Sequence, residues 1–292
     1  MPKKVLVLAS VASMIDQFNM PNIKLLQSMG YEVHVACNFL IGSTCSSAKI
    51  DALKQTLTEW GVSFFQIDFT RSVMNLKQDY IAYKQVKQLM LQNKYAFVHC
   101  HSPIGGVVGR LAGHVTKTKV IYTAHGFHFF KGAPLKNWLI YYPIEKFYAR
   151  YTDVLITINK EDYAFAQRKM HAKKICYVPG VGIDIEKIQS VECNRDEVRD
   201  SMGVPRDCLL LLSVGELNAN KNHQVVIRAL SKLNNPNVHY AIAGIGALKD
   251  DLLQLAEQFG VKKQLHLLGF RTDALKLYKA ADVFVFPSFR EG

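Results

Sequence analysis

The sequence predicts an α/β fold with two tandem Rossmann-like, doubly wound domains. Short β-branched and aliphatic runs alternate with helical patterns along the whole chain, which is typical of parallel βαβ units. The 292 residues suit two domains of ordinary size. An apolar fraction of 49% and a charged fraction of 21% are typical of a globular protein with large cores.

The first domain is expected to cover residues 1–178, and helices should lie between its strands. The predicted strands are Lys4–Leu8, Glu32–Ala36, Ser63–Ile67, Phe97–Cys100, Lys119–Thr123, Val154–Thr157 and Lys174–Val178. A turn-rich stop follows at Val178-Pro179-Gly180-Val181-Gly182. We interpret the polar, partly helical residues 179–206 as the interdomain connection.

The second domain is expected to cover residues 207–292. Its predicted strands are Leu209–Val214, Val238–Ala243, Leu265–Leu268 and Val283–Phe286, and its helices should start near Asn222, Leu248 and Thr272. Two such domains in tandem present two sets of strand ends, a setting that binds nucleotides and sugars.

Cysteine usage and hydropathy indicate a reducing, aqueous compartment. The six cysteines show no C-x-x-C pair, which favours reduced thiols over a disulfide or zinc scaffold. No run approaches the roughly 18 apolar residues of a membrane span. We therefore expect a cytoplasmic protein, peripheral on the inner face of the cell membrane.

The charge is unevenly placed. The formal net charge is +12, and no carboxylate occurs between Asp79 and Glu145. Such a surface attracts phosphates or an anionic membrane, and no nucleic-acid partner is expected. A solvated basic face without a partner is the alternative.

Residues 127–151 interleave aromatic rings with lysines and an arginine. A face of this kind can lie at a lipid headgroup layer. Core packing of a helix interrupted at Pro143 is the alternative explanation for many of these rings.

The strongest local pattern for a ligand is the loop from Ser213 to His223. A buried strand ends at Val214, Gly215 allows a sharp turn, Lys221 supplies a cation, and Asn222 suits a helix N-cap. Free N–H groups at a helix start bind anions, so we predict a phosphate site here. An ordinary βα turn with a solvated lysine is the alternative.

Two further loops follow strands of the second domain. Gly244 and Gly246 form a G-x-G pair that permits close backbone approach to a ligand. Gly269-Phe270-Arg271-Thr272-Asp273 follows the next strand, and Thr272 or Asp273 is expected to cap a helix there.

In the first domain, His125 ends a strand and precedes Gly126, so its imidazole can enter a ligand site. A histidine satisfied in the core is the alternative. His99, His101 and His128 raise a second alternative, a metal site with His125, but the segment lacks carboxylate ligands. We expect neither a metal nor a cofactor.

The chain ends with a buried strand, a Pro/Ser turn, a charged pair and a glycine, Asp282-Val283-Phe284-Val285-Phe286-Pro287-Ser288-Phe289-Arg290-Glu291-Gly292. Such a loop lies at the carboxyl end of a parallel strand, where ligands bind, and a helix should follow it. No helix follows, so we expect the second domain to be incomplete.

Together these loops resemble glycosyltransferase family 4, whose members have a GT-B fold of two Rossmann-like domains. The same pattern includes Val98-His99-Cys100-His101-Ser102-Pro103-Ile104-Gly105-Gly106, Tyr122-Thr123-Ala124-His125-Gly126-Phe127 and Val178-Pro179-Gly180-Val181-Gly182-Ile183-Asp184. The match covers the whole chain and is closest to bacterial members that assemble capsular polysaccharides and exopolysaccharides.

The resemblance implies a retaining hexosyltransferase. It would move a sugar from a nucleotide diphosphate donor, expected to be a UDP-sugar, to a polyprenyl-diphosphate-linked or polysaccharide acceptor. Lys221 would hold the donor pyrophosphate, and His125 would bind the donor near the reacting carbon. Glu291 would be the first of two Glu separated by seven residues and would bind sugar hydroxyls. Backbone groups at Phe270 and Arg271 would contact the base.

The sequence also departs from the family pattern. Glu216 stands where many members place an Arg on the phosphates, and the second Glu of the motif falls beyond Gly292. The loop from Ala9 to Asp16 lacks a Gly pair, for which Ser10 and Ser13 can substitute as small donors. A nucleotide-sugar epimerase of the same fold, a weak nucleotide-binding remnant without turnover and a metal-dependent hydrolase are the alternatives.

Overall fold

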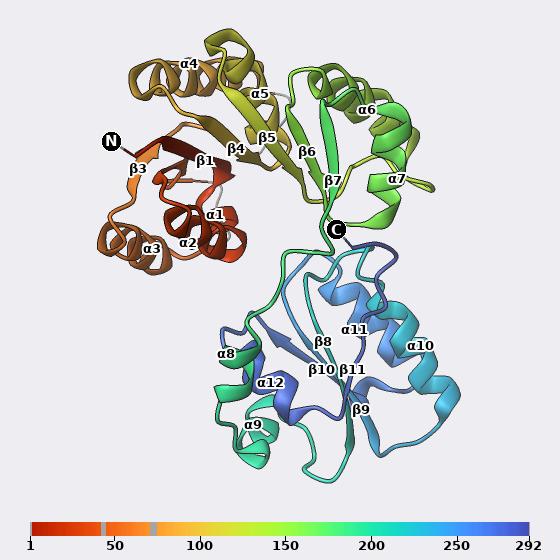
Figure 1. Ribbon diagram of the computed structural model, residues 1–292. Coiled ribbons are helices and arrows are strands. Elements are labelled where there is room, and N and C mark those ends of the chain that lie inside the picture. Colours follow the sequence, from red (N-terminus) through yellow and green to blue (C-terminus); the bar gives the residue numbers. More distant parts are fainter. Residues whose placement is uncertain (1, 42–44, 71–74, 292) are drawn as a thin grey trace. The chain divides into compact units, whose positions relative to one another are not determined.

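The computed structural model describes residues 2–41, 45–70 and 75–291. They form two compact units that divide between Gly182 and Ile183 (Figure 1). Gly292, the last residue of the predicted closing loop, lies outside the described residues.

The first unit is built on a parallel sheet with the strand order β3-β2-β1-β4-β5-β6-β7. The strands are β1 (Lys4–Val11), β2 (Glu32–Asn38), β3 (Ser63–Gln66), β4 (Phe97–His101), β5 (Lys119–Ala124), β6 (Val154–Thr157) and β7 (Lys174–Tyr177). This is the Rossmann strand order, so the predicted doubly wound topology is confirmed. The order reverses between β1 and β4.

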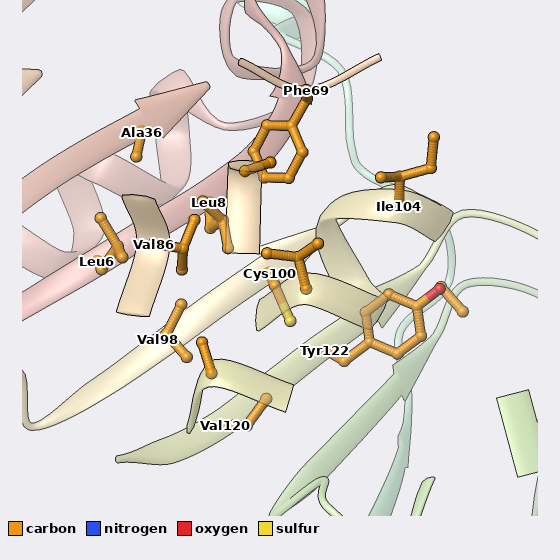
Figure 2. Packing of buried hydrophobic residues seen from close by; sticks show 14 of the residues in the cluster. Leu6, Leu8, Ala36, Phe69, Val86, Val98, Cys100, Ile104, Val120 and Tyr122 are labelled. Carbon is orange, nitrogen blue, oxygen red and sulfur yellow. The ribbon is translucent and has the colours of Figure 1, made fainter. Parts of the chain in front are cut away.

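Helices cover both faces of this sheet, as the apolar character of the strands requires. They are α1 (Ala12–Phe18), α2 (Met20–Ser28), α3 (Ser47–Glu59), α4 (Leu76–Asn93), α5 (Pro103–Thr116), α6 (Leu135–Ala149) and α7 (Lys160–Lys169). Leu8, Cys100 and Tyr122 pack against residues of α4 and α5 on one face (Figure 2). Val7 and Val35 pack with residues of α1 and α3 on the other.

The second unit repeats the first half of this topology. Its elements are α8 (Ile185–Ser190), α9 (Arg195–Met202), β8 (Leu209–Val214), α10 (His223–Leu233), β9 (Val238–Ala243), α11 (Lys249–Gln258), the 3-10 turn η1 (Lys262–Gln264), β10 (Leu265–Gly269), α12 (Ala274–Ala280) and β11 (Val283–Phe284). Its parallel strands lie in the order β10-β9-β8-β11, so the order reverses between β8 and β11.

The predicted connection, residues 179–206, is mostly part of the second unit. Within it, α9 carries Arg199, whose side chain is 1% exposed. Arg199 Nε donates to Ala280 O at 3.1 Å, and Arg199 Nη2 lies 2.7 Å from Asp282 Oδ2. The segment is polar in sequence, yet one of its cations, Arg199, is buried in the fold.

The aromatic segment that follows β5 packs largely inside the first unit. Phe127 and Phe129 are buried, and the Phe129 ring contacts Trp138, Tyr142 and Phe165. Much of this segment therefore has a structural role. All six cysteines are free thiols, as predicted. Within the described ranges, no helix has both the length and the apolar character needed to cross a membrane.

Candidate functional site

The second unit has its topological switch point between β8 and β11, and two loops meet there. One is the predicted phosphate loop after β8, and the other is the closing segment after β11. Phe289 N donates to Asn220 O at 2.9 Å, and Asn220 Nδ2 donates to Arg290 O at 2.7 Å. Open parallel sheets bind ligands at such a point.

Lys221 and Glu291 come together across these two loops. Lys221 Nζ lies 2.7 Å from Glu291 Oε1, with side chains 20% and 37% exposed. The ammonium group also lies 5.0 Å from the centre of the Phe286 ring. The switch point thus presents a cation and a carboxylate side by side, the two charges that a diphosphate and sugar hydroxyls would need.

The helix that starts beside Lys221 is not capped in the predicted way. Asn222 stands at the N-cap position with φ +52°, but its Nδ2 donates to Pro287 O at 3.2 Å. Asn218 Oδ1 instead accepts from Lys221 N at 3.0 Å and holds the loop. A cavity of about 210 Å³ opens beside this first turn and is lined in part by Asn218, Asn222 and His223.

The glycines of the second unit allow its loops to pack closely. A Cβ on Gly244 would lie 1.8 Å from Gly215 O, and one on Gly246 would lie 2.4 Å from Leu217 O. A Cβ on Gly215 would lie 3.2 Å from the Lys221 side chain. These glycines therefore let the loop after β9 support the phosphate loop, and nearby backbone fills the space expected for a ligand at Gly244 and Gly246.

The loop after β10 differs from its prediction. Phe270 is 69% exposed. The Arg271 guanidinium binds both carboxylate oxygens of Asp273, at 2.8 and 2.7 Å, and also donates to Ser201 Oγ at 3.2 Å. Asp273 stands at the N-cap of α12 without capping it, because its carboxylate is committed to Arg271. The predicted cap by Thr272 or Asp273 is therefore wrong.

A buried polar chain underlies the phosphate loop. His223 Nδ1 lies 2.9 Å from Tyr240 Oη, Tyr240 donates to Ser213 Oγ at 2.8 Å, and Ser213 donates to Val285 O at 2.5 Å. The chain links α10, β9, β8 and the segment after β11. The sequence alone does not reveal these hydrogen bonds, because only the parallel register brings the residues together.

In the first unit, His125 belongs to a group of imidazoles at the carboxyl ends of β4 and β5. His101 Nδ1 lies 3.1 Å from His125 Nε2, and His99 Nε2 lies 2.8 Å from Thr123 Oγ1. His101 pairs with Thr123 in the parallel register, so residues two apart on both strands share one face. The Phe18 ring lies 5.4 Å from the His125 ring.

The environment keeps these imidazoles neutral. Burial, with a smaller effect of the neighbouring imidazoles, lowers the pKa of His99 to about 4 and that of His101 well below its usual range. Burial also lowers the pKa of His125. Among the described residues, no three His, Cys, Asp or Glu side chains are placed to hold a metal ion.

At the switch point of the first unit, between β1 and β4, two serines bind each other. Ser10 Oγ lies 2.8 Å from Ser102 Oγ, and Ser10 N donates to Ser102 Oγ at 3.2 Å. Ser102 has φ +65°, unusual for a residue with a Cβ. Ser10, expected to act as a small donor, bonds to its own domain. Ser13 is also buried.

Two family models match the chain. The model described as glycosyl transferase 4-like matches residues 4–159. The model described as glycosyl transferases group 1 matches residues 194–292.

Curated relatives match over nearly the whole chain. A Bacillus subtilis protein named as glycosyltransferase EpsD is 38% identical over 100% of this chain and 74% of its own length. The UDP-Gal:alpha-D-GlcNAc-diphosphoundecaprenol alpha-1,3-galactosyltransferase of Escherichia coli is 28% identical over 98% of this chain and 73% of its own length.

Solved structures share the fold. Anabaena HepE in complex with UDP-glucose superposes with a TM-score of 0.72 at 18% identity, over 98% of this chain and 74% of that one. WaaG, a glycosyltransferase involved in lipopolysaccharide biosynthesis, gives a TM-score of 0.67 at 17% identity, over 99% and 75%.

Proposed function

The chain belongs to the glycosyl transferase 4-like family and is a glycosyltransferase of GT-B fold, and we propose that it transfers a sugar from a UDP-sugar to a polyprenyl-diphosphate-linked acceptor with retention of configuration. The proposal applies to the synthesis of a cell-surface polysaccharide. We also propose that the protein acts at the inner face of the cell membrane.

The observation that carries the proposal is the pairing of Lys221 with Glu291 at the switch point of the second unit. Glycosyl transfer from a nucleotide sugar leaves negative charge on the departing diphosphate. Lys221 and the N-terminal N–H groups of α10 are suited to stabilise that charge. Glu291 is suited to accept hydrogen bonds from the hydroxyl groups of the donor sugar.

Four of the predicted site residues would act indirectly, by shaping the loops that hold Lys221 and Glu291. Their contacts indicate this role for Gly215, Asn222, Gly244 and Gly246. Backbone groups at Phe270 and Arg271 would contact the base. In the first unit, His125 would act as a neutral hydrogen-bond partner of the donor near the reacting carbon. The Glu216 carboxylate accepts a hydrogen bond of 3.1 Å from Asn218 Nδ2 of the same loop.

The proposed classes of donor and acceptor are taken from the ligands named for similar proteins. HepE was solved with UDP-glucose, and the Escherichia coli relative is named for UDP-Gal and a diphosphoundecaprenol-linked sugar. The carboxylate-free stretch between Asp79 and Glu145 suits an anionic acceptor. We propose that cations and N–H groups of the chain serve the leaving diphosphate without a metal ion.

A donor panel tests the proposal. Purified protein would be incubated with UDP-, GDP- and dTDP-sugars and a polyprenyl-diphosphate-linked monosaccharide in detergent, with and without EDTA. We expect transfer from one UDP-sugar, insensitivity to EDTA, and an α-linkage by NMR if the donor is α. Conversion of a donor without acceptor would instead support an epimerase, and no conversion of any donor would contradict a transferase.

A further inference from the structure

An apolar groove runs along the outer face of the first unit, between the helices α4, α5 and α6. Its volume is about 410 Å³. Leu76 and Tyr80 of α4, Val107 and Leu111 of α5, and Ile144 of α6 lie in its walls. The volume is within the usual range of ligand pockets, roughly 300 to 1,000 Å³. Concave apolar surfaces that are left open to water often mark ligand or interaction sites.

We propose that this groove binds the isoprenoid chain of the lipid-linked acceptor. The inference rests on the proposed function, since it assigns a place to that acceptor. At this site the protein would recognise the lipid of the acceptor rather than its sugar.

The position of the groove supports an acceptor chain. Pro103 and Ile104, in the first turn of α5, line it and directly follow Ser102 at the switch point between β1 and β4. From Ile104 to Leu111 the α5 wall is about 10 Å long, at about 1.5 Å per helical residue. A chain in the groove can therefore place its head group at the carboxyl edge of the sheet, where His125 lies.

The groove walls favour a hydrocarbon over a peptide. A peptide would bring backbone N–H and C=O groups that apolar walls leave without partners, at a cost of about 1 to 3 kcal/mol for each buried group. An isoprenoid chain brings none. Because the groove is concave, it also suits a single chain better than the flat surface of a bilayer.

The groove wall carries two acidic side chains, Asp79 and Glu145, and Lys84 lies beside it, with its Nζ 4.6 Å from the centre of the Tyr80 ring. Of the two acids in the wall, Glu145 is neutralised by Arg110, whose Nη1 lies 2.8 Å from its Oε2. Burial raises the pKa of the other, Asp79.

Photolabelling locates the chain without depending on turnover. A polyprenyl diphosphate with a diazirine on its chain would be irradiated with the full protein in detergent, and the labelled peptides would be mapped by mass spectrometry. We expect labels within residues 76–83, 103–111 and 141–148. Labelling confined to other parts of the surface would overturn the proposal and would indicate non-specific membrane contact instead.

Paired variants give the second measurement. Leu76→Glu on α4 and Ile144→Glu on α6 place a charge in the groove. Leu91→Glu and Leu139→Glu change exposed leucines of the same two helices outside it. We expect the groove variants to lose labelling about tenfold, which corresponds to about 1.4 kcal/mol, and the controls to keep it. Equal labelling of all four would overturn the proposal.

Kinetics separate this proposal from the proposed function. With a long-chain acceptor, the groove variants should raise KM about tenfold, while kcat/KM for a short-chain, water-soluble acceptor stays at the wild-type value. Transfer that is equally fast in wild type and groove variants for both acceptors would reject the groove alone. Absence of transfer in the wild type would reject the proposed function, and photolabelling would still decide the groove.

Discussion

His101 holds the imidazole of His125 through a hydrogen bond of 3.1 Å between His101 Nδ1 and His125 Nε2. The other nitrogen of His101, Nε2, is buried without a hydrogen-bond partner. A buried N–H without an acceptor is rarer and costlier than a buried lone pair. The proton of His101 is therefore expected on Nδ1, which leaves the proton of His125 on Nδ1, free to be donated to a ligand oxygen.

This tautomer can be tested directly. Long-range ¹H–¹⁵N NMR of the wild type should show His125 protonated on Nδ1. His101→Phe should mix the two tautomers and lower kcat about tenfold, as loss of a supporting contact often does, with little change in KM. His101→Asn, whose amide can replace the Nδ1 donor, should restore both. A His125 proton on Nε2 in the wild type would contradict the assignment.

The buried imidazoles also predict how stability depends on pH. Imidazoles of the unfolded chain take up protons near pH 6.5, whereas burial lowers the pKa of His99 to about 4 and that of His101 well below 6.5. The unfolded state therefore binds more protons as pH falls. The free energy of unfolding should drop from pH 6.5 downward, by up to about 1.4 kcal/mol per pH unit for each such histidine.

Urea unfolding at pH 7.5, 6.5, 5.5 and 4.5 measures this slope. His101→Phe should show a shallower fall over the same range, because one buried imidazole is missing. Parallel curves for wild type and variant would show that His101 takes up its proton equally in the folded and unfolded states.

At the residue scale, the sequence could predict Lys221 and Glu291, because each follows a recognisable strand and turn. It could not predict that Arg271 and Asp273 bind each other, or that Ser10 bonds to Ser102. Each of these side chains has several partners within reach, and only the folded structure determines which one it binds. The G-x-G pair at Gly244 and Gly246 could be recognised, but only the structure shows that the close approach is to Gly215 and Leu217.

At the scale of elements, central strands such as β1 and β9 could be predicted because each is buried on both faces and reads as an apolar run between turn signals. The ends were less predictable. The first strand continues past Leu8 to Val11, because Ser10 is kept in the sheet by its bond to Ser102. The last strand ends at Phe284, although Val285 N still donates to Leu212 O at 2.8 Å.

The loops after β8 and β9 should tolerate no side chain at Gly244. A Cβ there would lie 1.8 Å from Gly215 O, so Gly244→Ala must displace the phosphate loop. We expect calorimetry to show UDP affinity at least tenfold weaker for the folded variant. Gly106→Ala is the control, because its Cβ would crowd the Tyr122 ring at 2.5 Å in the other unit. If Gly244→Ala binds UDP like wild type, the loop after β9 does not set the phosphate site.

Asp282 ties α9 to β8. Its Oδ2 accepts from Leu210 N at 2.7 Å and from Arg199 Nη2 at 2.7 Å. Burial alone would raise the pKa of Asp282, but these hydrogen bonds and the ion pair with Arg195 outweigh burial and lower it. Its contribution to stability is therefore complete above pH 4 and is lost as pH falls through the lowered pKa.

Asp282→Asn should lower the free energy of unfolding by about 3 kcal/mol at pH 7, because Arg199 is left buried without its anion. Asp196→Asn is the matched control, since Asp196 is 58% exposed and lies 3.9 Å from Arg206. The control should change stability by less than about 0.5 kcal/mol. Equal losses in the two variants, measured by urea unfolding, would contradict the role given to Asp282.

At the scale of the whole molecule, two units of one topology carry different chemistry at the point where the strand order reverses. In the first unit two serines bind each other at this point, and His125 lies beside it, in contact with His101 of β4. In the second it presents a cation and a carboxylate. The partnership of Lys221 with Glu291, 70 residues apart, could not be read from either motif alone. It exists because β11 pairs with β8.

The most direct test of the donor site at the switch point of the second unit is calorimetry. UDP and the active UDP-sugar would be titrated into wild type, Lys221→Ala and Glu291→Gln. Lys221→Ala should weaken binding of both ligands at least tenfold, since it removes a charge-assisted contact to phosphate. Glu291→Gln should keep or tighten UDP binding, because it frees Lys221, and should remove the affinity that the sugar adds. Wild-type affinity for UDP in Lys221→Ala would contradict the assignment of the switch point as the donor site.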